Sequence, residues 1–403
     1  MRHLLILLAL LFAVSTAPPA CADDVPGVTD DQILIGMTVD LTGPLAFIGQ
    51  QGSAGLRLYL NHINEQGGVH GRRIDLRVED DGYQPARTIA AFRKLLDRDG
   101  VFCFVGNLGS SQTMATFPFV KRARVPVLMP MNFNSAMSTP HKRYVFGHDP
   151  SYPIQSWLMV KHIVEVEKAT SPRLAVLYQD DGYGRDGLQG LQEAAAHYGI
   201  PIVAEEGYKS GTVDFGSQVL NMRKAEPTHV IFWSVYREAA AVMKEARQIG
   251  WQPQFIGGGP AGDDKTLELA GEAASGYQAL GIIDLSSDDE EMTLYRQLLA
   301  AESPGQEPNI YHAMCYSAGQ TLVEALHRAG QDLSREKLVD ALETLREWDG
   351  TLMAPITYSP GMHGGQSTAA FMMRADLERG QMVRSSDWVR YNSQDYLAQQ
   401  DQD

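Results

Sequence analysis

The chain has 403 residues, of which 44% are hydrophobic and 21% charged, and its 49 Asp and Glu outnumber its 34 Lys and Arg to give a net charge of −15. Such an acidic balance argues against nucleic acid and anionic membrane surfaces as partners, because both attract basic proteins. A chain of this length exceeds what one hydrophobic core usually organises, so we expect two domains.

Residues 1–22 are predicted to be an export signal. A basic start precedes an apolar run of eleven residues, LLILLALLFAV, which is too short to span a bilayer comfortably. Small residues around Cys21 then form a cleavage site, so we expect cutting after about Ala22 and release of the exported chain. Lipid attachment at Cys21 is the alternative, and it is disfavoured because no leucine stands three positions upstream.

From Gln32 the chain alternates short apolar runs with amphipathic helical patterns, which is typical of a parallel sheet flanked by helices. The first such unit is predicted to have strands over 33–40, 73–81, 101–106 and 125–130, with helices over 52–68 and 85–100. The second unit repeats this order, with strands over 173–181, 200–208, 229–234 and 253–259 and helices over 154–167, 184–199, 215–225 and 237–250.

After Ser275 the alternation stops. An extended segment over 276–285 is followed by helical patterns over 290–302, 310–330 and 334–348, and then by an extended run over 352–360. If the helical region returns to the first unit, these two extended segments and residues 143–150 cross between the units. The prediction is an α/β protein with two doubly wound, Rossmann-like lobes, whose parallel sheets are joined by a three-strand hinge.

The corresponding domain boundaries follow from those crossings. Lobe I is predicted to comprise residues 23–146 and 282–355, and lobe II residues 147–281 and 356–390. Residues 391–403 are polar and charged, so we interpret them as a frayed tail.

Residues 106–113 leave the third predicted strand through two glycines, and Ser110 and Ser111 follow the second of them. Neither serine is followed two positions later by the glycine of a nucleophile elbow, and no pair of histidines has the spacing of a metalloprotease. We therefore expect neither catalytic nor metal-binding residues, no cofactor, and a protein that is not an enzyme.

An anion site suits the same loop. Where a strand passes through glycine into a helix, several backbone N–H groups lack partners, and the positive end of the helix dipole lies behind them. The two serine hydroxyls add donors there. The alternative is that one serine is only the N-cap of a helix that starts near Gln112.

Two cysteines follow the export signal. Cys103 lies in an apolar strand and Cys315 in a helical pattern. Two cysteines are not a disulfide framework, so we expect two buried thiols in preference to a bridge between them.

Four blocks of the chain, in this order, resemble the periplasmic solute-binding proteins of branched-chain amino-acid ABC transporters, the Leu/Ile/Val-binding type: IGMTVDLTGPLAFIGQQGSAGLRLYLNHINEQGGVHGRRIDLRVEDD, VGNLGSSQT, LYQDDGYGRDGLQGL and FWSVYREAAAVMKEARQIGWQPQFIGG. The resemblance implies the type I periplasmic binding fold and a monomer in the periplasm, without nucleic acid or membrane insertion. It also implies that the lobes close over a small ligand and deliver it to a membrane permease.

The resemblance also implies site residues. Ser110 takes the place of the hydroxyl that binds a ligand carboxylate, with Ser111 beside it, and Tyr183 reaches in from the second lobe. The other expected contacts are Met131, Asn132 and Phe133 on the pocket wall, Phe47 and Ile48 on the first-lobe side, and Trp233 and Tyr236 near the cleft. Tyr183 has the alternative role of stiffening a turn, and Trp233 that of a core residue.

One departure from the family bears on the ligand. Members that bind an α-amino acid supply a carboxylate for its ammonium from the loop that here contains Gly257, Gly258 and Gly259. A buried ammonium without a partner costs several kcal/mol. Unless Asp263, Asp264 or Glu238 substitutes for the missing acid, we expect the ligand to be an aromatic or apolar carboxylate or an uncharged small molecule. The alternatives are a urea or short-amide binder, and the ligand-sensing component of a signalling system.

Overall fold

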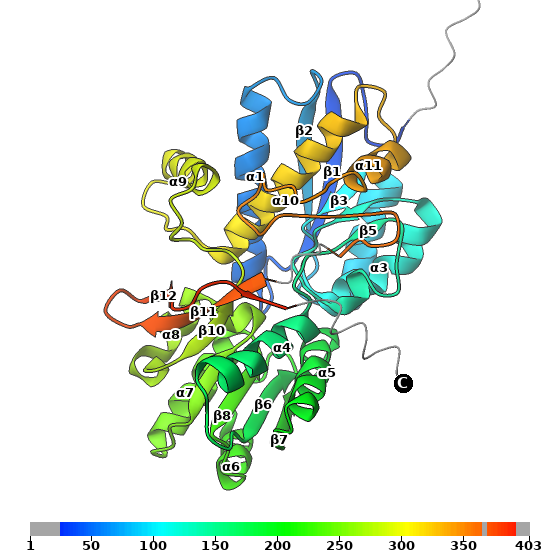
Figure 1. Cartoon of the computed structure of the whole chain (residues 1–403). Helices are drawn as coiled ribbons and strands as arrows, with labels where there is room; N and C mark the ends of the chain where they lie inside the picture. The colour runs from blue at the N-terminus through cyan, green and yellow to red at the C-terminus, as the bar shows by residue number, and fades with distance from the viewer. Residues whose placement is uncertain (1–24, 365–368, 392–403) are drawn as a thin grey trace, which may run out of the picture.

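The computed structural model describes residues 25–364 and 369–391, which form two α/β lobes (Figure 1). The sheet of the first lobe has the order β2-β1-β3-β4-β5, and every neighbouring pair is parallel. Its strands are β1 (Gln32–Val39), β2 (Arg73–Asp80), β3 (Cys103–Val105), β4 (Val127–Leu128) and β5 (Val145–Phe146). The first four agree with the predicted strands, although β3 and β4 are shorter than the apolar runs that contain them, whereas β5 lies in the segment 143–150 that was predicted only as a crossing between the lobes.

The sheet of the second lobe has the order β12-β11-β10-β9-β8-β6-β7. Its parallel part contains β6 (Leu174–Gln179), β7 (Ile202–Tyr208), β8 (His229–Trp233), β9 (Gln254–Gly257) and β10 (Gln278–Gly281). Three C-terminal strands extend this sheet with antiparallel pairing. Strand β11 (Ala369–Asp376) lies between β10 and β12 (Gln381–Arg384). Strand β13 (Val389–Arg390) also pairs with β11. The sequence predicts no strand after 360, so this sheet is mixed where an entirely parallel one was expected.

Helices cover the faces of both sheets (Figure 1). They are α1 (Ala46–Glu65), α2 (Pro85–Arg93), α3 (Ser110–Ala123), α4 (Tyr152–Lys161), α5 (Gly182–His197), α6 (Gly216–Lys224), α7 (Tyr236–Gln248), α8 (Asp264–Ala270), α9 (Glu290–Glu302), α10 (Ile310–Ala329) and α11 (Arg335–Leu342). Within the described ranges no helix has both the length and the hydrophobicity needed to cross a bilayer. Helix α1 starts earlier than the predicted 52–68, so Phe47 and Ile48 lie in its first turn.

The first lobe is completed by α10, which returns from the C-terminal third of the chain and packs along α1. Glycine makes this approach close: a Cβ on Gly55 would stand 2.0 Å from the carbonyl oxygen of His312. Helices α4 and α5 pack in the same way in the second lobe, where a Cβ on Gly190 would stand 2.2 Å from Cα of Pro153. Cys103 and Cys315 are both free and buried.

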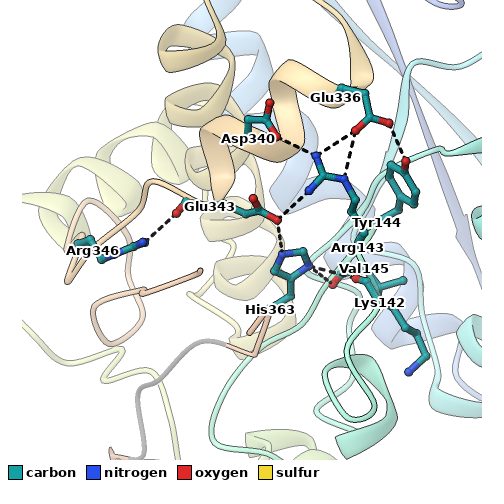
Figure 2. A network of polar contacts seen from close by, with 9 residues as sticks. All are labelled: Lys142, Arg143, Tyr144, Val145, Glu336, Asp340, Glu343, Arg346 and His363. Atoms are coloured by element: carbon teal, nitrogen blue, oxygen red, sulfur yellow. Dashed lines mark hydrogen bonds and ion pairs between the residues drawn. The ribbon is translucent and has the colours of Figure 1, made fainter. Parts of the chain in front are cut away.

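The chain passes between the lobes three times, after β5, after β10 and before β11 (Figure 1). Figure 2 shows the network that ties two of these passages to α11. Arg143, just before β5, contacts Glu336, Asp340 and Glu343 at 3.0, 2.8 and 3.3 Å. His363, just before β11, is fully buried and its Nε2 lies 3.0 Å from Glu343 Oε1.

The third passage is also bonded to the first directly. The carbonyl oxygen of His363 accepts a hydrogen bond from the Gly147 N–H at 2.7 Å, and the Tyr358 hydroxyl donates to the Gly147 carbonyl at 2.9 Å. The imidazole of His363 stacks on Phe146 with ring centroids 3.8 Å apart. These contacts hold two of the connecting segments together, whereas the exact lobe boundaries remain a prediction.

Candidate functional site

A cavity lies between the lobes, at the carboxyl ends of the parallel strands, which is where open α/β sheets bind ligands. About 730 Å³ between its walls is free of protein atoms, part of it open to solvent. The walls are formed by Leu45, Ile48, Tyr83, Leu108, Gly109, Ser110, Met131, Asn132, Phe133, Tyr152, Gln155, Tyr183, Val235, Gly259, Pro260, Leu280, Ile282, Ile310, Tyr311 and Met314. None of these residues is charged at neutral pH, so any recognition by these walls uses hydrogen bonds, dipoles and apolar contact.

One part of the cavity wall is the N-terminus of α3, where the sequence predicts an anion site. Ser110 is its first residue and Gly109, with φ of 94°, is its N-cap, so the helix starts before Gln112 and neither serine is the cap. The first intrahelical bond runs from the Thr113 N–H to the Gly109 carbonyl, which leaves the N–H groups of Ser110, Ser111 and Gln112 without intrahelical partners. Ser110 is buried, and its Oγ makes no hydrogen bond of normal geometry within the protein, although the side chain of Tyr152 lies close enough to act on it. Backbone and side-chain donors therefore meet at one point of the cavity wall.

The wall beside Ser110 is the loop after β4. Met131, Asn132 and Phe133 all line the cavity, as the sequence predicts. The Met131 N–H donates to the Asn107 carbonyl at 2.8 Å, and Asn132 Nδ2 lies 3.4 Å from the Gly109 carbonyl oxygen. These bonds tie the loop after β4 to the loop after β3, so these two segments of the cavity wall are held in one arrangement.

Another part of the cavity wall is aromatic. Tyr183 is buried and its hydroxyl donates to the Ser234 carbonyl at 3.0 Å, while the ring of Tyr152 meets it edge-on at 4.9 Å. Burial raises the pKa of Tyr183 well above its usual value, so the phenol stays neutral. Trp233 lies behind both rings, fully buried, and donates from Nε1 to Ser156 Oγ at 2.9 Å. Trp233 is thus a core residue and does not line the cavity.

Three further predicted residues lie at the edge of the cavity and bridge the lobes. Phe47 of α1 meets the ring of Tyr236 from the second lobe edge-on at 5.8 Å. Ser111 Oγ accepts a hydrogen bond from the Gly182 N–H at 3.0 Å. These contacts join the two lobes and therefore belong to a closed conformation, in which the lobes touch on both sides of the cavity.

Gly259 lines the cavity with φ of 53°, in the left-handed region that glycine adopts most readily. A Cβ at this position would stand 3.3 Å from the Tyr183 hydroxyl oxygen and 3.6 Å from Cε1 of Tyr152. A side chain at this position would therefore contact both tyrosines, and its approach to the Tyr183 hydroxyl would require a shift of a few tenths of an ångström.

The three acids that sequence reasoning offers as substitutes lie outside the cavity walls. Glu238 is buried, Oε2 has no partner, and burial raises its pKa to about 7. Asp263 caps α8, accepts from Asn309 Nδ2 at 3.0 Å, and has its pKa raised by burial to about 7. Asp264 accepts from the Met382 N–H at 2.6 Å. Each is held in its own lobe or at the seam between the lobes, so none supplies a carboxylate to the cavity in this closed form.

Sequence reasoning missed several wall residues, chiefly Tyr83, Tyr152, Gln155 and Tyr311. Tyr83 follows β2 just as Ser110 follows β3, so the rule that loops at the carboxyl ends of strands face the cleft would have found it. Its hydroxyl accepts from Gln179 Nε2 of the second lobe at 3.2 Å. Tyr311 reaches the cavity from α10, and no local pattern indicates that.

The lobes, the cleft and the uncharged cavity define a bilobed solute-binding protein. The chain belongs to the periplasmic binding protein family, whose model matches residues 32–381. A leucine-, isoleucine-, valine-, threonine- and alanine-binding protein of Pseudomonas aeruginosa is 26% identical over 77% of this chain and 82% of its own length. No group of three His, Cys, Asp or Glu side chains is placed to hold a metal ion in the part of the chain that the structure describes.

Solved structures agree on the fold. A possible leucine/isoleucine/valine-binding protein from Rhodopirellula baltica has a TM-score of 0.82 and 24% identity, covering 90% of this chain and 98% of its own. A fatty acid ABC transporter substrate-binding protein from Thermomonospora curvata has a TM-score of 0.83 and 22% identity, covering 91% and 95%. The type I periplasmic binding fold predicted from sequence is confirmed.

Proposed function

We propose that this protein captures a small carboxylate with an apolar or aromatic body and no ammonium group, and delivers it to an ABC permease. The observation that carries the proposal is a cavity with hydrogen-bond donors at one end and no charged side chain on its walls. In this proposal the chain is exported and its signal removed after about Ala22, so that capture takes place in the periplasm.

The hydrogen-bond donors at the start of α3 support a ligand that carries a carboxylate. Backbone N–H groups at a helix N-terminus and a serine hydroxyl bind an anion without a basic side chain. The unpartnered Ser110 Oγ is a buried polar group that a ligand oxygen would satisfy.

The aromatic and aliphatic walls of the cavity support a ligand that has no ammonium group. An α-ammonium held near Gly259 would face tyrosine rings and neutral hydroxyls, with no carboxylate on the described walls. Leaving that charge unpaired costs several kcal/mol, more than the 1.5 to 3 kcal/mol or so that burying one side chain contributes. The names of the relatives include both amino-acid and fatty-acid binders, so membership of the family is compatible with either class.

The test compares ligands that differ only in the ammonium. Isocaproate is leucine without that group, and hydrocinnamate is phenylalanine without it. We expect both acids to bind at least about 100-fold more tightly than their amino-acid counterparts, since about 2.7 kcal/mol separates them. Isothermal titration calorimetry on ligand-stripped protein measures the four affinities, with isocaproamide and urea as uncharged probes.

Micromolar binding of leucine would contradict the proposal and would show that Asp263 or Glu238 reaches the ammonium when ligand is present. Tighter binding of isocaproamide than of isocaproate would instead favour the short-amide alternative. Both outcomes leave the fold assignment untouched, because that rests on the family match.

A matched prediction concerns Ser110. Ser110→Ala removes the free hydroxyl, and we expect isocaproate to bind roughly 5- to 150-fold more weakly, which corresponds to the 1 to 3 kcal/mol lost when a charged acceptor is left unmatched. Folding should be unaffected. The control is Ser53→Ala, whose Oγ donates to the Gln50 carbonyl in α1 and does not line the cavity. Equal calorimetric affinity in wild type and Ser110→Ala would remove Ser110 from the site.

A further inference from the structure

The first turn of α5 docks on a short segment of the first lobe beside the cavity. Asn134 Nδ2 donates to the Gly182 carbonyl. One turn later, Asp186 accepts two hydrogen bonds from Ser135, one from its backbone N–H at 2.8 Å and one from its hydroxyl at 2.5 Å. Neither Ser135 nor Asp186 lines the cavity. Because the two residues belong to different lobes, their bonds exist only while the lobes are closed.

Asp186 has no counter-charge in direct contact; the cation of the docking segment, Lys142, donates to the carbonyls of Ala136 and Pro140 and forms no ion pair with Asp186. No ion pair involves this carboxylate among the described residues, and the charge that acts on it is that of Glu193, further along the same helix, which repels it. The helices packed against α5 add no nearby cation: α3 has no charged residue before Lys121, and the one basic residue of α4, Lys161, lies in its last turn. The neighbouring Arg185 is paired with Asp180. Tyr152 is neutral at physiological pH and is the other titratable group that senses Asp186.

We propose that Ser135 and Asp186 are positioning residues that hold the lobes closed over the ligand, and that closure is coupled to the uptake of a proton by Asp186. The inference rests on the proposed function in that closure is what retains the ligand. It adds two residues that do not line the ligand cavity. It also makes closure over the ligand depend on the pH of the periplasm, which is exposed to external acidity.

The direction of the coupling follows from burial. In the closed form burial raises the pKa of Asp186 to about 6, whereas an exposed aspartate has a pKa near 3.9. The closed form therefore binds the proton more tightly than the open form. Lowering the pH through 6 towards 4 shifts the equilibrium towards closure, and the shift is absent well above pH 6. With these two values, ligand affinity rises by about tenfold between about pH 7.5 and about pH 5.

The experiment measures the affinity for isocaproate and hydrocinnamate at about pH 7.5 and about pH 5 in wild type, Asp186→Asn and Ser135→Ala. The amide of Asp186→Asn resembles the protonated acid, so we expect the tenfold gain to disappear and the affinity at the higher pH to be at least that of wild type. Ser135→Ala removes a donor to the ionised carboxylate. It should weaken binding at the higher pH and move the midpoint of the pH profile upwards. The control is Asp214→Asn, an exposed acid of the second lobe that should retain the wild-type profile.

Other carboxylates and the ligand itself titrate in the same window, but their effects are common to wild type and Asp186→Asn and cancel in the ratio. Equal pH profiles for these two proteins would overturn the coupling, and so would weaker binding by Asp186→Asn at the higher pH. If neither acid binds, the proposed function fails on its own. Closure is then tested by small-angle scattering of ligand-free protein, whose radius of gyration should fall at the lower pH in wild type but not in Asp186→Asn. An unchanged radius in wild type would overturn the proposal.

Discussion

Gly55→Leu is expected to destabilise the protein by more than about 3 kcal/mol, because the backbone of α10 occupies the position that the new side chain needs. The Cβ of the leucine would stand only 2.0 Å from the carbonyl oxygen of His312. Backbone in a packed helix pair cannot move aside as a flexible side chain does. Urea unfolding followed by circular dichroism should show either a much lower midpoint or no folded state.

The control for this substitution is Gly216→Ala at the first position of α6. There a Cβ would stand 3.4 Å from Asp214 Oδ1 and 3.7 Å from Glu245 Oε2, which are ordinary van der Waals distances. We expect a change within about 1 kcal/mol, since alanine is the better helix former. A Gly55→Leu protein as stable as this control would mean that α1 and α10 pack less closely than described.

Gly259→Glu is expected to abolish carboxylate binding without creating an amino-acid site. The resemblance to the family by itself implies a different outcome, a preference moved towards amino acids, provided that the loop tolerates a side chain at position 259. The structure opposes this in two ways: φ is 53°, where an L-residue is strained by about 1 to 2 kcal/mol, and the new Cβ would stand 3.3 Å from the Tyr183 hydroxyl oxygen, so that one of the two side chains has to shift. A loss of at least about 100-fold in isocaproate affinity, about 2.7 kcal/mol, is expected by calorimetry.

Gly259→Asn separates the two causes, because asparagine tolerates the left-handed region but still has a Cβ. If strain dominates, Gly259→Asn should retain most of the binding. If crowding against Tyr183 dominates, it should bind as poorly as Gly259→Glu. Tight leucine binding by Gly259→Glu would restore the prediction made from sequence and show that the tyrosines move aside.

Local patterns predict the strand and helix order well because each strand buries a short apolar run and each helix shows its own periodicity. The resemblance to the family also places Ser110, Asn132 and Tyr183 at the pocket, and all three line the cavity, in the segments that follow parallel strands β3, β4 and β6. Their roles in binding remain proposals, which the substitutions above test.

The failures have a common cause, which is that tertiary neighbours decide the outcome. Trp233 ends a strand next to the cleft, but the hydroxyl of Ser156 on a different helix satisfies its indole and keeps it in the core. The residues of β11 include the short apolar run AAFMM, which local pattern alone does not distinguish from a buried helix segment, and pairing with β10 makes them a strand. The sequence predicts a start of α3 near Gln112, whereas the helix begins at Ser110, because the positive φ that makes Gly109 the N-cap cannot be deduced from the residue types.

The last third of the chain completes both lobes, and this sets an order on folding during synthesis. Helix α10 must arrive before α1 has its partner, and β11 must arrive before β10 has its second neighbour. Contacts between segments so distant in sequence form slowly, because the intervening loop must close first. We therefore expect a nascent chain lacking α10 and β11 to remain without a finished core in either lobe, which is the unfolded state that the proposed export through a membrane channel would require.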